Sequence, residues 1–577
     1  MGASRSNLGK GTGAAVLVAL ACSFACVAAA VAPEAPPTEG GRLVVALRAE
    51  PSTLNPTTAV RTGEWAVIGR LHASLVTLDR ETLEPVPALA ESWVVSREGR
   101  VLDLKLRRGV RFSDGEPFDA EDVVFTFEAL LDEENAAPQR ATFVLDGEPV
   151  RVTATGSHSV RFELGRPRAA AVRMLDGVWI LPSHRVRSLA EAGKWPQAWG
   201  VGTPPGEMVG LGPFRLVHHR AGERLVLERN PHYWKRDARG VRLPYLDEIE
   251  FVFVSSEDAE VVRFAAGDTD IIDHISPDNF QALQRGVGER VLTDLGPGLS
   301  YSFLFFNLND LGGRDLPQVE QRQGWFRERD FRQAVSLGID RIGIARVVYR
   351  GLAAPLATHM STANGAWRNP ALEPPRRDLE AARRALRRAG FGWRGDGTLV
   401  DGAGRAVRFS VLVSATNTTR RRIASLIQHD LAPLGITVDV VPFDHGSLLE
   451  RVTASFDYDA VVLELQFHDA EPMAHFSTLV SGGSTHLWSL GGQPVGDWEA
   501  ELDRLMREQG MSVEADRRRE LYYRVQEIVA RELPFIPLVS PDVLVGTRAG
   551  LGGCRPSVLD HSLLWNADEL YWESRPR

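Results

Sequence analysis

Residues 84–131 read EPVPALAESWVVSREGRVLDLKLRRGVRFSDGEPFDAEDVVFTFEALL, and nearly every residue in this stretch has a readable structural role. Leucines alternate with polar residues over 102–107, which is the period-2 pattern of a strand with one buried face. An Asp-Gly pair at 114–115 predicts a turn. Asp119, followed by Asp122, then predicts the start of a helix, because their carboxylates can accept hydrogen bonds from free backbone N–H groups.

The helix expected after Asp119 carries Val123, Phe127 and Leu130 at spacings of four and three, so one of its faces is apolar and should pack inward. None of the residues from 84 to 131 forms a catalytic pattern. The stretch therefore predicts a packed strand–turn–helix unit and favours a binding scaffold over an enzyme.

The same stretch contains P-x-L-A-x-S-W and then G-V-x-F-x-D-G-x-P-F-x-A-x-D-V-x-F-T, which resembles the signature of the family 5 extracellular solute-binding proteins. These are the peptide- and nickel-type receptors of bacterial ABC importers. Further segments resemble elements of that family in the same order: LVVALRAEPSTLNP (43–56), GLGPFRLVHH (210–219), LERNPHYW (227–234), AAGDTDIID (265–273), FRERDFRQAVSLGIDRIGIARVVYRG (326–351) and RELPFIPLV (531–539). The resemblance thus covers almost the whole mature chain.

The resemblance implies an α/β fold of the two-lobed periplasmic-binding-protein (Venus flytrap) type, with a discontinuous first lobe and an inserted α+β subdomain. The expected divisions are an export signal at 1–32, a tether at 33–41, lobe I at 42–69, 200–298 and 541–577, the inserted subdomain at 70–199, and lobe II at 299–540. The residues themselves predict a helix at 379–391 and strands at 436–443 and 458–467. We expect the hinge between the lobes near 296–302 and 538–543.

Composition and charge agree with a large extracytoplasmic receptor. The chain has 577 residues, 44% hydrophobic and 24% charged, which is too long for one core and ordinary for globular domains. The formal net charge of -9 disfavours nucleic acid as a partner, because phosphate recognition needs basic patches. Two short arginine runs, at 420–422 and 517–519, are expected on solvated helix faces. We expect a monomer.

Residues 1–32 have the composition of an export signal, with a positively charged start, a short apolar core and an A-x-A-like site ending at Ala32. Lipidation at Cys22 or Cys26 is the alternative to cleavage after Ala32. Either route places the protein in the periplasm or another extracytoplasmic space, free or lipid-anchored. Cys554 is the only cysteine outside this region, so no internal disulfide is expected.

The expected ligand is an oligopeptide, although the second lobe departs from the family pattern. In peptide-binding relatives, an aspartate four residues before the proline of a D-P or E-P pair meets the ligand amine. In LQFHDAEPMAHF, His468 occupies that position and Asp469 lies one residue later, where a small shift could bring it into the cleft. His445 falls where many relatives have a tryptophan, so two histidines would give the pocket a partly pH-dependent charge.

Other candidate ligand contacts come from two further segments. Arg421 and Arg422 precede a predicted helix at the place where dipeptide-binding relatives hold the ligand carboxylate with a guanidinium. Thr62, Glu64 and Trp65 follow the T-L-N-P turn where relatives line the cleft, and Trp65 could stack on ligand or pack in the core.

The function implied is an extracytoplasmic receptor that delivers its solute to the permease subunits of an ABC transporter by lobe closure. Two alternatives stay open: a non-peptide ligand, such as a metal chelate, haem, sugar or opine, and a sensory binding protein. A secreted hydrolase is disfavoured because the sequence contains no H-E-x-x-H, G-x-S-x-G or phosphate-cradling motif. We therefore assign no catalytic residue, metal ligand or cofactor.

Overall fold

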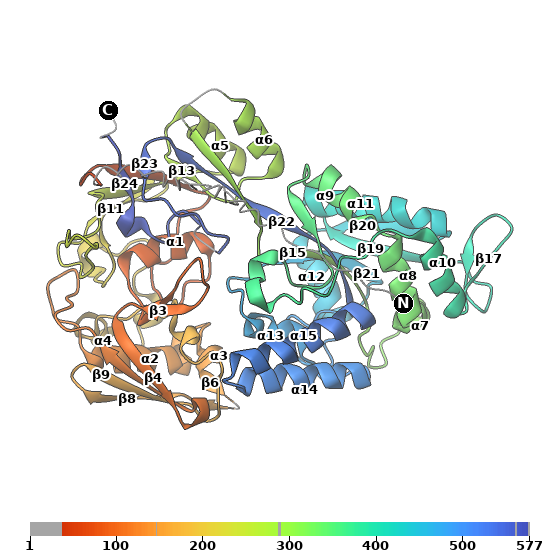
Figure 1. The fold of residues 1–577 in the computed structure, drawn as a ribbon, viewed down its shortest axis with the longest axis horizontal. Coiled ribbons are helices and arrows are strands. Elements are labelled where there is room, and N and C mark those ends of the chain that lie inside the picture. Colours follow the sequence, from red (N-terminus) through yellow and green to blue (C-terminus); the bar gives the residue numbers. More distant parts are fainter. Residues whose placement is uncertain (1–36, 146, 287–289, 560–561, 575–577) are drawn as a thin grey trace, which may run out of the picture. The chain divides into compact units, whose positions relative to one another are not determined.

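A long strand near the end of the chain, β22 (Phe535–Arg548), organises the fold (Figure 1). The computed structural model describes residues 37–145, 147–286, 290–559 and 562–574. The predictions about the export signal, its cleavage or its lipidation fall on residues 1–36 and lie outside the described residues. Among the residues described, none of the helices combines the length and the apolar character of a membrane span.

β22 is buried along most of its length because two consecutive strands pair with it one after the other. Residues 535–539 pair with β15 (Tyr301–Phe306), and residues 542–548 pair with β14 (Arg290–Pro297). The chain therefore passes from one part of the sheet to the other twice, at 298–300 and at 540–541. These positions lie within the two segments predicted to form the hinge.

The main sheet is mixed. Its path runs through β10 (Phe214–Arg220), β11 (Arg224–Arg229), β12 (Glu248–Phe253), β1 (Arg42–Leu47), β13 (Ile271–Ile272), β22, β15, β21 (Ala460–Leu465), β19 (Arg408–Ser414) and β20 (Thr437–Phe443), while β14 and β16 (Ala353–Pro355) also pair with β22. β1 is parallel to β12, and β19 is parallel to both β20 and β21. Their near-continuous apolar runs are typical of parallel strands that are covered on both faces.

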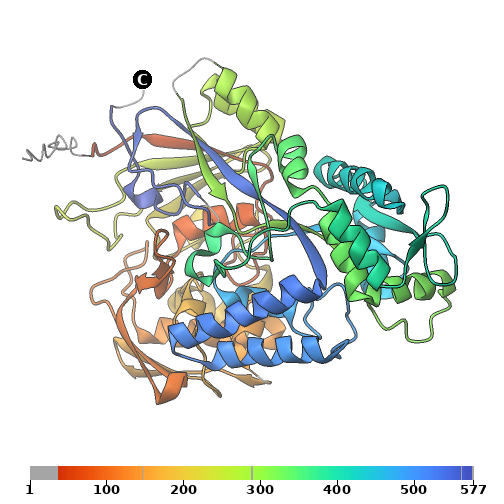
Figure 2. The same cartoon turned by 45° about the vertical axis from the view of Figure 1, so that its right-hand side comes forward.

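Helices surround this sheet. The longer ones are α1 (Thr62–Leu71), α5 (Glu257–Ala266), α6 (Pro277–Arg285), α7 (Pro317–Arg327), α8 (Arg329–Gly338), α9 (Arg341–Val348), α10 (Leu379–Arg388), α11 (Thr418–Leu431), α14 (Asp497–Met511) and α15 (Ala515–Glu532). Figure 2 shows α14 and α15 side by side, as their mutual contacts require. The predicted helix at 379–391 is confirmed as α10, and the predicted strands at 436–443 and 458–467 are confirmed as β20 and β21.

The stretch at 84–131 folds as predicted. It forms β4 (Ala90–Ser96), β5 (Val101–Leu106) and α2 (Ala120–Leu131), and β5 pairs with β9 (Ser159–Glu163), which in turn pairs with β8 (Arg151–Gly156). Asp119 caps α2 by accepting a hydrogen bond from the Glu121 amide at 2.9 Å, and Asp122 accepts one from the Asp119 amide at 3.1 Å. The backbone N–H groups of Asp119 and Glu121 at this helix start are therefore satisfied by neighbouring side chains.

Buried apolar side chains fall into three large clusters. The first draws on residues between 301 and 539, the second on residues from 43–71, 125–129, 181–271 and 543–572, and the third on residues 75–180 with Val209 and Leu211. These segments resemble those expected for lobe II, lobe I and the inserted subdomain, whose boundaries stay predictions.

Two glycines of the GLGPF segment are required by close approach to α1. A Cβ on Gly210 would lie 2.1 Å from the carbonyl oxygen of Leu71, and one on Gly212 would lie 2.4 Å from that of Arg70. The Gly212 amide also donates to the Leu71 carbonyl at 2.9 Å. The chain leading into β10 is thus fixed directly against the end of α1.

The first described residues are bonded to the last strand of the chain. Trp572, in β24 (Tyr571–Trp572), donates its indole N–H to the carbonyl of Arg42 at 2.9 Å, and its own carbonyl accepts from the hydroxyl of Thr38. The Gly40 amide donates to the Tyr245 carbonyl at 2.7 Å. The described part of the predicted tether, residues 37–41, is therefore held against the body of the protein.

Candidate functional site

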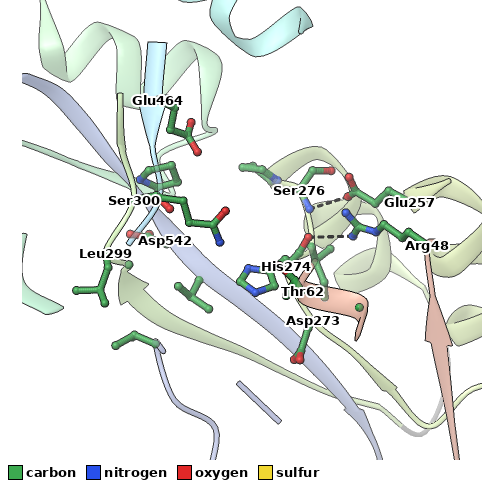
Figure 3. A pocket seen from close by; sticks show the side chains of 18 of the residues that line it. Arg48, Thr62, Glu257, Asp273, His274, Ser276, Leu299, Ser300, Glu464 and Asp542 are labelled. Atoms are coloured by element: carbon green, nitrogen blue, oxygen red, sulfur yellow. Dashed lines mark hydrogen bonds between the residues drawn. The ribbon is translucent and has the colours of Figure 1, made fainter. Parts of the chain in front are cut away.

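A cavity of about 690 Å³ lies beside the passage from β14 to β15 (Figure 3). Its volume is within the range of small-ligand sites. It is lined by residues of β1, the start of α1, the segments 271–277 and 298–300, the start of α11, the end of β21, and 541–543 of β22. The cavity thus draws on segments expected for both lobes and on both strand passages.

Hydrogen bonds hold one wall of the cavity in place. Arg48 donates to the carbonyl of His274 at 3.2 Å and to a carboxylate oxygen of Glu260 at 2.7 Å. Glu257 accepts from the amide of Ser276 at 2.7 Å, and Figure 3 shows this bond beside the one from Arg48 to His274. The segment between β13 and α6 is therefore presented to the cavity in a fixed conformation.

Two carboxylates of the cavity combine a raised pKa with the lack of a cationic hydrogen-bond partner. Glu464 accepts only a 3.3 Å bond from the Ser302 hydroxyl, and burial raises its pKa while the charge of Arg420 opposes that rise. Burial, with repulsion from Asp294, raises the pKa of Asp542 to about 6. In the described part of the chain, no side-chain hydrogen bond or ion pair reaches the Asp542 carboxylate. The cavity therefore contains two carboxyl groups that have no cation in hydrogen-bond contact among the described residues.

The residues predicted after the T-L-N-P turn occupy three different environments. Thr62 lines the cavity. Glu64 is buried and accepts from the Ser52 hydroxyl at 2.6 Å and from the Arg61 amide at 3.0 Å, so it closes the loop that precedes α1. Trp65 is partly buried, donates to the Ala59 carbonyl at 3.2 Å and packs against the second hydrophobic cluster.

The arginines predicted to hold a ligand carboxylate lie outside the cavity lining. Arg421 and Arg422 are exposed, and Arg422 lies 3.6 Å from Asp278. Their neighbour Arg420 is half-buried and is the member of the run whose charge acts on Glu464. The helical phase of α11 therefore turns the preceding arginine, rather than the predicted pair, toward the cavity side.

The residues predicted at the amine site also lie beside the cavity and not in its lining. His468 is exposed, and its ring meets that of Trp65 edge-on at 5.7 Å between centroids. Asp469 accepts a two-pronged hydrogen bond from Arg173, with 2.6 Å between Nε and Oδ2. His445 is exposed at the start of α12 (His445–Glu450).

Sequence reasoning missed Glu464 and Asp542, although both carry a recognisable signal. Each is a lone carboxylate in an otherwise apolar strand segment, AVVLEL for Glu464 and FIPLVSPDVLV for Asp542. Burying a charged group costs free energy, so such a residue needs a partner in the protein or in a ligand. Across the described residues, no group of three or more His, Cys, Asp or Glu side chains is placed to hold a metal ion.

The α/β fold and its ligand-sized cavity are those of a solute-binding protein. The chain belongs to the bacterial extracellular solute-binding proteins of family 5, whose model, described as the family 5 middle region, matches residues 84–486. The resemblance seen in the sequence is therefore confirmed.

Similar proteins from other bacteria are binding proteins. A probable ABC transporter-binding protein of Deinococcus radiodurans is 25% identical over 497 residues, covering 82% of each chain. Di/tripeptide-binding protein 3 of Pseudomonas aeruginosa is 26% identical, covering 82% of this chain and 84% of the relative. A periplasmic alpha-galactoside-binding protein of Rhizobium meliloti is 28% identical, covering 82% of this chain and 71% of the relative.

Solved structures share the fold. NikA from Brucella suis, in complex with Fe(III)-EDTA, superimposes with a TM-score of 0.76 at 20% identity, covering 92% of this chain and 99% of the other. The oligopeptide-binding protein AppA from Bacillus subtilis, in complex with a nonapeptide, gives a TM-score of 0.69 at 22% identity, covering 93% and 100%. The predicted α/β fold of the periplasmic-binding-protein type is confirmed.

Proposed function

We propose that the protein is an extracytoplasmic receptor that binds oligopeptides and delivers them to the permease subunits of an ABC importer. The observation that carries the peptide assignment is the pair of unneutralised carboxylates, Glu464 and Asp542, in a cavity of about 690 Å³. A free peptide amine is a compact cation whose charge such carboxylates can neutralise and whose N–H groups can donate hydrogen bonds to them. The names of relatives that bind di- and tripeptides support the same class.

In this proposal the amine meets Glu464 and Asp542, and Thr62 contacts the ligand from the opposite side of the cavity. Binding a cation favours the ionised form of a carboxylate whose pKa burial has raised. A bound amine would therefore lower the pKa of these two carboxyl groups, which burial raises in the empty cavity. The remaining predicted contacts, which are Glu64, Trp65, Arg421, Arg422, His445, His468 and Asp469, stay predictions.

Lobe closure around the ligand is the second part of the proposal. Its support is the double strand passage along β22, where the carbonyl of Gly298 accepts from the hydroxyls of Ser361 at 2.6 Å and Ser540 at 2.9 Å. The Gly298 amide donates to the Pro541 carbonyl at 2.9 Å. A ligand that contacts segments on both sides of these passages would shift a hinge equilibrium toward the closed state.

Export by residues 1–32 and action as a monomer belong to the same proposal. Intact-mass measurement of the mature protein distinguishes cleavage after Ala32 from lipidation at Cys22 or Cys26. Sedimentation of the purified protein tests the monomer.

Native mass spectrometry of protein purified from rich medium tests the ligand class. We expect a ladder of bound masses that spaces as peptides and disappears after partial unfolding and dialysis. A single non-peptide mass, such as a chelate, an opine or an oligosaccharide, would refute the peptide assignment while leaving the receptor intact. Turnover of a bound peptide by the purified protein would instead refute the receptor.

A further inference from the structure

A second hollow, of about 640 Å³, carries five arginines and shares none of its lining with the first cavity. We call it the arginine pocket and define it by Glu91, Arg107, Arg108, Gly109, Val110, Arg111, His232, Tyr233, Trp234, Arg236 and Arg242. Its residues come from β4, from the turn that follows β5, and from the segment after β11. A concentration of cations in one hollow is unexpected in a chain with a net charge of -9.

None of these five arginines forms an ion pair with a carboxylate of the described residues. Four of them are held instead by backbone carbonyls: Arg107 by Ala88 at 2.6 Å, Arg111 by Gly115 at 2.8 Å, Arg236 by Gly240 at 2.8 Å and Arg242 by Pro231 at 2.6 Å. Such a bond fixes a guanidinium while leaving its charge and most of its five N–H donors available. The one carboxylate of the lining, Glu91, lies 3.4 Å from Lys105.

The arginine run at 517–519 behaves differently. In the 517–519 run, Arg517 pairs with Glu508 at 2.7 Å, Arg519 pairs with Asp516 at 2.8 Å, and Arg518 pairs with the buried Glu471. Each guanidinium of that run thus has a carboxylate within reach. The arginine pocket gathers five guanidinium groups without one, which points to a ligand as the missing anion.

Aromatic groups complete the pocket. The Arg107 guanidinium lies 4.7 Å from the centre of the Trp234 ring, a cation–π contact that holds both groups in place. The indole N–H of Trp234 is buried and has no hydrogen-bond partner among the described residues. This unpartnered donor thus belongs to a side chain that lines the pocket.

We propose that the arginine pocket binds a small anion carrying two phosphoryl groups. Guanidinium groups match phosphate oxygens with paired N–H donors. Five cations without a counter-charge require a multivalent anion. Two phosphoryl groups supply about three to four negative charges at neutral pH, because the second pKa of a phosphate lies at about 6. This inference does not depend on the receptor's ligand, because the two cavities have no lining residue in common.

Titration calorimetry with inorganic pyrophosphate at low ionic strength tests the site. The test variant is Arg111→Glu with Arg242→Glu, two exposed residues held only by backbone carbonyls. The matched control is Arg376→Glu with Arg384→Glu, which changes the net charge equally at exposed positions outside the pocket. We expect affinity to fall about tenfold or more in the test variant and less than about twofold in the control, because each lost charge-assisted bond is worth at least about one power of ten.

Absence of pyrophosphate binding to the wild-type protein, or equal losses in the two variants, would overturn the proposal. Binding of a glutamate-rich peptide without binding of pyrophosphate would overturn the phosphoryl assignment. Vesicles of cardiolipin, whose headgroup carries two phosphates, and of phosphatidylcholine distinguish a lipid from a soluble anion as the source of the phosphoryl groups. Retention on cardiolipin alone, with release by pyrophosphate, assigns the pocket to a lipid headgroup, whereas no retention assigns it to a soluble anion.

Discussion

Asp542 lies on a strand that crosses between two parts of the sheet, and it has no cation to balance it. Because burial raises its pKa to about 6, a large fraction of the carboxyl is protonated at pH 5 and little of it at pH 7. A cationic ligand binds the ionised form, so binding must displace a proton at the lower pH. Under the proposed peptide assignment, ligand affinity is thus coupled to pH through Asp542.

For a peptide with a free amine, we expect affinity to rise between pH 5 and pH 7. At pH 7, Asp542→Asn should lower affinity by about tenfold, which is the contribution of one hydrogen bond to a charged group. Calorimetry at both pH values measures each effect. Asp268→Asn, at an exposed position outside the cavity, is the control. An N-acetylated peptide that binds with the same affinity and pH dependence would contradict the assignment of the amine to Asp542.

Glu471 and Arg518 form a buried ion pair, and Arg518 also donates to the carbonyl of Gln509 at 3.1 Å. Glu471→Gln should lower the free energy of unfolding by about 3 kcal/mol, because it leaves a buried guanidinium without its counter-charge. Urea unfolding measures the change. Glu380→Gln, which removes the exposed partner of Arg383, should change stability by less than about 1 kcal/mol. Equal effects of the two substitutions would show that burial does not set the strength of the first pair.

At the scale of elements, the GLGPF segment packs so closely against the end of α1 that its glycines leave no room for a side chain. Gly210→Ala should destabilise the protein by about 3 kcal/mol, the upper range for overpacking, since its Cβ would lie 2.1 Å from a backbone oxygen. Gly202→Ala is the matched control, because a Cβ there has no neighbour within 4 Å. Thermal unfolding of the two variants checks this. Similar midpoints would mean that the loop before β10 moves freely away from α1.

Periodicity was sufficient to predict β5, β20, β21, α2 and α10, because each carries its apolar face in its own sequence. The candidate site was harder to predict, since contacts there depend on which residue of a helix or strand faces the cavity. The arginine run at 420–422 was placed correctly along the chain, but the helical phase of α11 selects Arg420. The pair of Asp469 with Arg173 joins residues 296 positions apart, and no local pattern encodes such a contact.

At the scale of the whole molecule, Arg173 joins the 70–199 segment to the loop after β21. It donates to Asp469 and also to the carbonyl of Leu83. If the lobes close on ligand as proposed, this pair would stabilise the closed form without touching the ligand. In that role Asp469 would act on every ligand alike, whereas Asp542 would discriminate by charge.

Asp469→Asn should therefore increase the dissociation rate of free and N-acetylated peptides by a similar factor of about three to ten, as expected for loss of a charge-assisted pair. Stopped-flow fluorescence measures these rates. Asp439→Asn is the control, because its two-pronged pair with Arg408 joins neighbouring strands of one sheet. Unchanged rates in Asp469→Asn would remove this ion pair from the closing mechanism.

Three buried histidines, His72, His359 and His475, link stability to pH. Burial lowers the pKa of each, to about 3 for His72 and His475. Below pH 6.5 the unfolded chain takes up protons that the folded chain excludes, so each histidine lowers stability by about 1.4 kcal/mol per pH unit as the pH falls toward its folded pKa.

The buried carboxyls of Asp176 and Asp542 oppose this trend below pH 6, since burial raises the pKa of each to about 6. The informative quantity is therefore the difference between variants. His475→Gln should flatten the fall in unfolding free energy between pH 7 and pH 5 relative to wild type, as measured by urea unfolding. The exposed His218→Gln should leave the fall unchanged. Parallel curves for His475→Gln and wild type would mean that His475 is protonated in the folded protein.

The hydrogen bonds between Trp572 and both Arg42 and Thr38 make a circular permutant practicable. A short glycine linker could join residues 573 and 38. The chain could be opened at the turn between β17 (Gly392–Trp393) and β18 (Leu399–Val400), where Gly397 has a positive φ of 86°. Because the first and last described residues lie close together, joining them costs little loop-closure entropy. Fluorescent reporters could then be attached at the new ends without disturbing the hydrogen bond between Trp572 and Arg42, which would turn the receptor into a sensor for its own solute.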